Sequence, residues 1–301
     1  MMDLSVTSAA LEVWGAPLAE SAVVLGAGFV LQRVLAFRPA AERHALWVTA
    51  FSGVGLLLGL SVQRLATLHS TLVWGDAFDA MVGIWALGAG IAMLPVVVGL
   101  VRLWAESRGL PRQVVSGCTT VYAPVATAYT WGWLRPVVVL PEGLQPRTAA
   151  FDTILAHERA HIERHDWLVS VLVRLVCAAL WFQPLVWWAA KALHRTAEQA
   201  TDDRVLRTGV LPSRYAGLLV QMASGGSDLG LGVARSDVSA RVHAILAPRS
   251  RGIRRWPVLV LGWGLAVWAV PKLVVASPWR LTTLSPGCAP MSPLDAAEEQ
   301  P

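Results

Sequence analysis

The sequence predicts a mainly α-helical, polytopic membrane protein: a helical bundle with four spans, a re-entrant helical hairpin and a small β element. Composition is the first reason, because 55% of the 301 residues are hydrophobic and 15% are charged, whereas soluble domains are about a quarter charged. The second reason is the presence of four apolar runs, each long enough to cross about 30 Å of hydrocarbon. The third is the count of 15 Trp, a residue that collects at membrane–water interfaces.

The four predicted spans are residues 18–37, 46–62, 80–101 and 257–276. Basic residues favour the cytosolic side of a membrane, and in this chain they gather in the links 38–45 and 102–256. This bias places both basic links inside and the N-terminus and residues 63–79 outside. We therefore expect a multi-pass membrane protein with residues 102–256 on the cytosolic side.

These spans divide the chain into four regions: 1–101 with three spans, 102–256 as one cytosolic domain, 257–276 as the last span, and 277–301. The last region is an extracytoplasmic tail, and we expect it to be disordered because it is rich in Pro and acid and has no apolar periodicity. In such a protein a net charge of +5 reflects loop placement, so no direct nucleic-acid binding is expected. The three cysteines are widely spaced and predict neither a disulfide framework nor a Cys-based metal site.

The cytosolic domain contains the pattern H-E-x-x-H, which is typical of zincin-like metal sites. His157 and His161 are four residues apart, so on a helix beginning near Thr148 or Asp152 they share one face, about 6 Å apart. Two imidazole nitrogens can then converge on one Zn²⁺. Glu158 lies about 100° round the helix, where it can take a proton from a water activated by the metal. The alternative is an exposed, charged helix end.

A third metal ligand is needed, and the sequence offers two candidates. His165 lies eight residues after His157, about 12 Å along a continuous helix, so we expect it to be interfacial or solvated. Glu198 would complete a His, His, Glu set with one open position. Asp202, one turn later, would accept the second ring N–H of a liganding histidine. A solvated, charged helix face would explain Glu198 and Asp202 equally well.

Residues 167–190 are apolar enough for a fifth span, but a crossing would separate Glu198 from the two histidines. A crossing would also put the basic stretch 249–255 outside, against the positive-inside bias. We therefore predict a re-entrant helical hairpin over about 166–198. Pro184 begins a helix well and continues one poorly, which places the turn at Phe182–Pro184.

A short strand is predicted before the metal motif. Val137, Val138 and Val139 lie between prolines, which favours a strand at a sheet edge. A peptide substrate could add to such an edge beside the metal. A plain buried strand is the equal alternative.

Five stretches together resemble one family, the BlaR/MecR-type membrane metallopeptidases, which form the protease half of β-lactam sensor-transducers. The stretches are HERAHIERHDWL (157–168), FQPLVWW (182–188), EQATDD (198–203), PAAERHALW (39–47) and TWGWLRPVVVLPEGL (130–144). The resemblance covers about residues 18–275. It implies that His157, His161 and Glu198 are zinc ligands and that Glu158 is the catalytic base.

The resemblance implies a membrane-embedded zinc endopeptidase in signal transduction, in a bacterial-type inner (cytoplasmic) membrane. Its substrate would be a protein such as a transcriptional repressor or the protein itself. Two departures stand out: Thr201 occupies a position that is often Cys or Ala, and no penicillin-binding sensor domain follows residue 276. Direct β-lactam sensing is therefore not expected. The alternatives are a non-catalytic zinc-binding signalling protein, which would have no need of Glu158, and a prenyl-protein-type membrane zinc protease.

Overall fold

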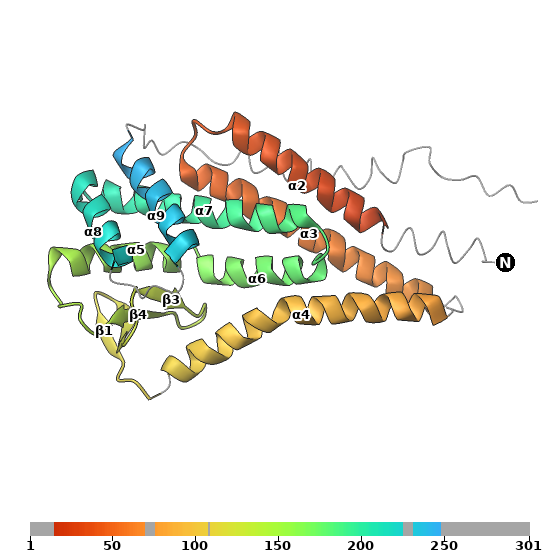
Figure 1. The fold of residues 1–301 in the computed structure, drawn as a ribbon, viewed down its shortest axis with the longest axis horizontal. Coiled ribbons are helices and arrows are strands. Elements are labelled where there is room, and N and C mark those ends of the chain that lie inside the picture. The colour runs from red at the N-terminus through yellow and green to blue at the C-terminus, as the bar shows by residue number, and fades with distance from the viewer. Residues whose placement is uncertain (1–14, 70–75, 108, 225–230, 248–301) are drawn as a thin grey trace, which may run out of the picture.

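The computed structural model describes residues 15–69, 76–107, 109–224 and 231–247. Over these ranges the protein is mainly helical with one small sheet (Figure 1), as the sequence predicts. The predicted fourth span, 257–276, and the tail, 277–301, lie outside the described residues.

Three long apolar helices form the N-terminal part: α2 (Ala16–Val34), α3 (Ala40–His69) and α4 (Asp76–Ser107). Each contains a stretch long and apolar enough to cross a bilayer, namely Ala16–Val34, Ala40–Gln63 and Phe78–Ala105. These stretches overlap the first three predicted spans, so the chain is a membrane protein. The large apolar side chains of α4 are mostly exposed, as expected for contact with lipid.

Close packing at one glycine fixes α2 against α3. Trp47 of α3 is completely buried, and a Cβ atom added at Gly28 of α2 would lie 3.0 Å from its ring. Phe29 meets the same ring edge-on, with the ring centroids 4.9 Å apart. The first two turns of α3 therefore have little freedom to move relative to α2.

A four-stranded sheet follows, made of β1 (Gln113–Val115), β2 (Cys118–Ala123), β3 (Tyr129–Trp131) and β4 (Val137–Pro141) in the order β1-β2-β4-β3. Strand β4 pairs in parallel with β2 and antiparallel with β3, so it is an interior strand. The interpretation of Val137, Val138 and Val139 as a substrate-binding edge strand is therefore wrong. All three side chains are buried, which matches the alternative of a plain buried strand. The prolines bound this strand without placing it at the edge.

Helix α5 (Ala149–Glu163) carries the H-E-x-x-H motif and packs on the sheet. Thr148 is its N-cap, and its Oγ1 accepts a hydrogen bond from the backbone N–H of Phe151 at 3.1 Å. The helix ends because His165 adopts the left-handed conformation, with φ of 56°. The expected continuous helix through His165 is thus interrupted, and α6 begins in a new direction at Asp166.

Helices α6 (Asp166–Ala179) and α7 (Pro184–Arg207) form a helical hairpin, with the turn at residues 180–183. Figure 1 shows this turn at the end of the hairpin that points away from the sheet, with α3 and α4 extending beyond it. At the turn, Gln183 accepts a hydrogen bond from Ser21 of α2 at 3.2 Å. Trp85 of α4 donates to the carbonyl of Ala179 at 2.8 Å. The hairpin therefore runs alongside the three apolar helices, with its tip beside the second turn of α2 and the third turn of α4.

Two further helices, α8 (Pro212–Ser224) and α9 (Leu231–Leu246), pack together beside the second half of α7. Their shared core is a cluster of buried side chains: Val205, Leu206, Tyr215, Ala216 and Ile245. This packing brings Tyr215 of α8 and Arg241 of α9 next to the metal motif.

Candidate metal centre

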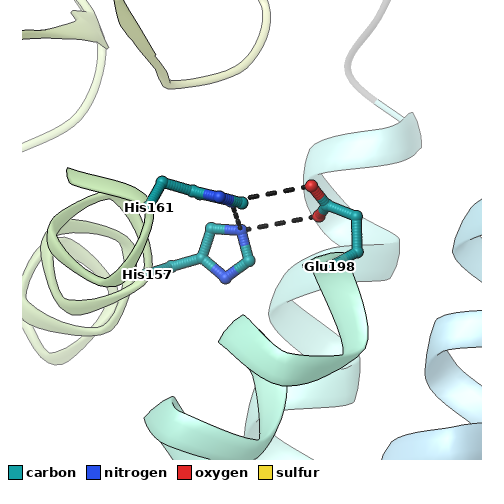
Figure 2. A group of neighbouring side chains, drawn as sticks. All are labelled: His157, His161 and Glu198. Atoms are coloured by element: carbon teal, nitrogen blue, oxygen red, sulfur yellow. Dashed lines mark hydrogen bonds and ion pairs between the residues drawn. The ribbon is translucent and has the colours of Figure 1, made fainter. Parts of the chain in front are cut away.

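Three side chains from two helices converge at one point (Figure 2). The Nε2 atoms of His157 and His161, both on α5, lie 3.2 Å apart. The carboxylate of Glu198, on α7, faces both: Oε2 is 3.7 Å from Nε2 of His157, and Oε1 is 3.6 Å from Nε2 of His161. The hairpin of α6 and α7 thus brings Glu198 back to the H-E-x-x-H motif of α5.

This donor set fits a tetrahedral metal ion. A zinc ion bound at about 2.0–2.1 Å by each ligand separates the ligand atoms by about 3.3 Å, close to the distances found here. All three residues offer a ligand atom within 4.8 Å of the others. Two imidazoles and one carboxylate leave a fourth position open, which is the pattern of catalytic sites.

The charges around the group also favour a cation. Burial would raise the pKa of Glu198, but the facing imidazole of His157 and the positive charge of Arg241 hold the pKa well below its usual range. Arg241 Nη1 lies 3.0 Å from Glu198 Oε2. Burial alone would lower the pKa of His161, yet the hydrogen bond with Asp166 and the nearby carboxylates raise it. The Glu198 carboxylate is therefore ionised, which is the form that binds a metal ion.

Glu158 lies beside the ligands and is not one of the three metal-facing residues of the described chain. Its carboxylate is 5% exposed and lines the same cavity. Thr130 of β3 donates a hydrogen bond from Oγ1 to Glu158 Oε2 at 2.7 Å. A carboxylate that is free of the metal and oriented by a hydroxyl is placed to act as a base.

The outer nitrogen of His157 is held through a tyrosine. His157 Nδ1 lies 2.9 Å from Tyr215 Oη, which donates a hydrogen bond to Asp202 Oδ1 at 2.6 Å. Asp202 itself is 3.6 Å from Nδ1, so the expected direct hydrogen bond is replaced by this bridge. Arg241 donates two hydrogen bonds to Asp202 and fixes its carboxylate. Asp202 therefore supports His157 through the Tyr215 hydroxyl, whereas the sequence predicted a direct hydrogen bond.

The outer nitrogen of His161 is held directly by a carboxylate that the sequence interpretation did not single out. Asp166 Oδ2 lies 2.7 Å from His161 Nδ1. Arg164 bonds the same carboxylate and also reaches the carbonyl of Ala197 and Thr201 Oγ1 on α7. The left-handed His165 makes this possible, because it turns Asp166 back toward α5. His165 itself is exposed, as expected.

A cavity of about 780 Å³ opens over the metal group. Strand β3 borders it on one side with Tyr129 and Thr130. An apolar part of its wall comes from α5 and α8, with Ile154, Leu218, Leu219, Met222 and Ala223. Such a cavity has room for several residues of an extended peptide.

Comparison with known proteins agrees with this site. The family model of the BlaR1 peptidase M56 matches residues 58–245, which include α5 to α9 and the whole metal group. The chain belongs to this family. Membership places it among the metallopeptidases, and the three apolar helices make it a membrane protein.

One relative among curated proteins is the regulatory protein BlaR1 of Bacillus licheniformis. It is 28% identical over 154 residues, which are 50% of this chain and 24% of the relative. The chain thus corresponds to about a quarter of that relative's length.

Five supporting residues emerge only from the structure. Thr130 and Asp166 lie inside stretches that carry the family resemblance, so the resemblance marks their neighbourhood without assigning them a role. Arg164 lies there as well. Nothing in the sequence distinguishes Tyr215 or Arg241, because each belongs to an ordinary helix far along the chain.

Proposed function

We propose that the protein is a membrane-embedded zinc endopeptidase that hydrolyses a protein substrate. The observation that carries the proposal is the combination of His157, His161 and Glu198 facing one point with a buried Glu158 beside them. A purely structural metal site has no use for the separate, oriented carboxylate of Glu158. The M56 family supports a peptidase rather than another hydrolase.

The residues divide the work of hydrolysis between them. The bound ion would polarise the scissile carbonyl and lower the pKa of water. Glu158 accepts a proton from the attacking water as its oxygen bonds to the carbonyl carbon. The same carboxyl then gives the proton to the amide nitrogen as the C–N bond breaks. Thr130 holds Glu158 for both steps through the hydrogen bond from Oγ1.

Strand β3 is the better candidate for binding the substrate backbone. It pairs with β4 on one side, and among the described residues no strand pairs with its other side. Tyr129 and Thr130 of this strand border the cavity. An extended substrate segment would add to β3 by backbone hydrogen bonds, with its scissile bond near Glu158. Strand β4, which contains residues 137–139, has a neighbour on both sides and offers no free edge to a substrate.

We also propose that the α6–α7 hairpin is re-entrant. Its tip touches Leu18 and Ser21 at the start of α2, while the metal group lies near the start of α3, just after α2 ends. The stretch of α2 from Ser21, which meets the tip, to the helix end at Val34 is about 20 Å long. The tip is therefore separated from the metal group by about two thirds of the hydrocarbon thickness of a bilayer. With the basic links inside, the metal group would face the cytosol of a bacterial-type inner membrane.

The substrate we propose is a transcriptional repressor or the protein itself, and both rest on the resemblance to the sensor-transducer proteases. Both substrates would reach the site from the cytosol. The protein substrate and the lipid bilayer are then the partners, without direct binding to nucleic acid.

Purified protein tests the enzymatic proposal. We expect about one zinc per chain and metal-dependent cleavage of a peptide library. Glu158→Gln should keep the zinc and lose cleavage, because the base is not a ligand. The matched control is Glu163→Gln, the same change at an exposed carboxylate of the same helix, which should cleave normally. Zinc binding without any cleavage by the wild type would favour the non-catalytic signalling protein.

The topology is tested with single cysteines in a background that lacks the native ones. Arg159→Cys precedes the hairpin and Arg207→Cys follows it, and both side chains are exposed. Membrane-impermeant thiol reagents should label both from the cytosolic side. Labelling of the two positions from opposite sides would make the hairpin a full crossing and overturn its re-entrant assignment.

A further inference from the structure

The first turn of membrane helix α3 enters the surroundings of the metal group. His44 is 7% exposed, and its side chain lines the same cavity as His157 and Glu198. It lies on α3 one turn before Trp47, the residue that packs against Gly28 of α2. A buried, polar side chain at this position of an apolar helix is costly unless its polar atoms meet a partner.

His44 faces the carboxylate that supports a metal ligand, while its Nδ1 is buried without a hydrogen-bond partner among the described residues. His44 Nε2 lies 3.5 Å from Asp166 Oδ1, and Asp166 Oδ2 lies 2.7 Å from His161 Nδ1. One carboxylate therefore bridges an imidazole of the membrane helix and an imidazole of the metal group. A shift of His44 would pull on one side of Asp166 and change the orientation of His161 on the other.

The neighbouring residue reaches the second ligand helix. Arg43 donates a hydrogen bond from Nη2 to Gln199 Oε1 at 2.9 Å, and Gln199 directly follows Glu198. Below this contact, Trp47, Ala50 and Val54 of α3 belong to one buried core with Val186, Ala189 and Leu193 of α7. Successive residues of α3 thus contact the supports of two different metal ligands.

A role in packing alone does not explain this pair. An aliphatic residue at position 44 would fill the space without the cost of burying an imidazole. The two contacts also diverge, since His44 approaches the corner between α5 and α6 while Arg43 approaches α7. The ligands that these two elements carry, His161 and Glu198, must stay about 3.6 Å apart to share an ion.

We propose that Arg43 and His44 are positioning residues that tie membrane helix α3 to the metal group. His44 acts on His161 through Asp166, and Arg43 acts on Glu198 through Gln199. The geometry of the metal group then depends on where α3 sits relative to α5 and α7, so a displacement of the membrane helix changes the metal site. This inference rests on the proposed function, because it presupposes that His157, His161 and Glu198 bind the ion.

Metal affinity and the visible spectrum of the Co²⁺-loaded protein test the local contact. In full-length protein in detergent, His44→Ala should weaken Zn²⁺ binding about 10-fold in a chelator competition and shift the Co²⁺ absorption bands. His44→Gln, which keeps an N–H group facing Asp166, should restore most of both. His243→Gln changes an exposed histidine of α9 and is the matched control.

A second experiment tests transmission from a distance. Gly28→Val would press on the ring of Trp47, 3.0 Å from the new Cβ, and so displace α3 without touching the metal group. Gly26→Val adds the same side chain two residues away, where a Cβ meets nothing within 4 Å. We expect Gly28→Val to lower Zn²⁺ affinity at least threefold and shift the Co²⁺ bands, and Gly26→Val to do neither.

The outcomes separate this inference from the proposed function. A wild-type protein that binds no Zn²⁺ would overturn both. Normal wild-type binding with unchanged affinity and Co²⁺ bands in both His44→Ala and Gly28→Val would overturn the inference alone. A loss of thermal stability in the metal-free His44→Ala protein, with wild-type affinity and spectrum, would assign His44 to packing and also overturn it.

Discussion

Tyr215→Phe removes a single oxygen atom from the support of His157 and should weaken zinc binding about 10-fold. The Tyr215 hydroxyl joins His157 Nδ1, at 2.9 Å, to Asp202 Oδ1, at 2.6 Å. Without it, Nδ1 faces Asp202 at 3.6 Å, which is too long for a hydrogen bond. A buried donor left without a partner costs about 1–3 kcal/mol. The lower part of this range applies if the imidazole turns toward Asp202, and about 1.4 kcal/mol is a tenfold change in affinity.

Competition with a zinc chelator in purified protein measures this change, and the thermal midpoint of the metal-free protein checks that the fold is kept. Tyr122→Phe on β2 is the matched control, because its hydroxyl oxygen is buried without a hydrogen-bond partner in the described part of the chain. Its zinc affinity should equal that of the wild type. Equal affinities for Tyr215→Phe and Tyr122→Phe would refute the view that Tyr215 holds His157.

Three further changes test other parts of the structure. Asp202→Ala should weaken zinc binding about 10- to 100-fold in the same assay, more than Tyr215→Phe, because Arg241 also loses its anchor; an effect no larger than that of Tyr215→Phe would contradict this. Gly88→Ala should destabilise the protein by about 1–3 kcal/mol in a thermal or denaturant unfolding scan, since the added Cβ would overlap the ring of Trp181. Gly90→Ala, where a Cβ meets nothing within 4 Å, should not destabilise it, and equal stability of the two variants would argue against the packing of α4 on the hairpin tip. Deletion of residues 277–301 should leave zinc content and folded yield unchanged, because the tail has no apolar periodicity; loss of folded protein would show that it contributes to the core.

The sequence predicted the local features of the site best. His157, Glu158 and His161 share two turns of one helix, so their spacing alone defines their geometry. Glu198 comes from the far side of a hairpin, and spacing could not choose between a ligand and a solvated carboxylate. The family resemblance pointed to it, and the contact between α5 and α7 now places its carboxylate beside both histidines. Metal analysis of purified Glu198→Ala, which should lose the zinc, tests its role as a ligand.

Two features could not be predicted from the sequence, and each has a physical reason. The order of the strands depends on a crossover that inserts β4 between β2 and β3, and proline positions do not reveal it. The break at His165 depends on one residue in the left-handed conformation, which histidine adopts only occasionally. Because of that break, Asp166 does not continue α5, and its carboxylate is hydrogen-bonded to His161. The first three spans, by contrast, follow from length and apolarity alone.

The division of the ligands between α5 and α7 has a consequence for how the protein matures. During synthesis the two histidines emerge before the hairpin, and Glu198 emerges after it. The hairpin packs against α2, α3 and α4, which precede it in the chain. Its second helix is also held beside the motif by α5 and by the hydrogen bonds from Arg164 to Ala197 and Thr201. Under the proposed function, the protease would therefore gain its third ligand only after the whole hairpin has been made and has packed against the helices that precede it.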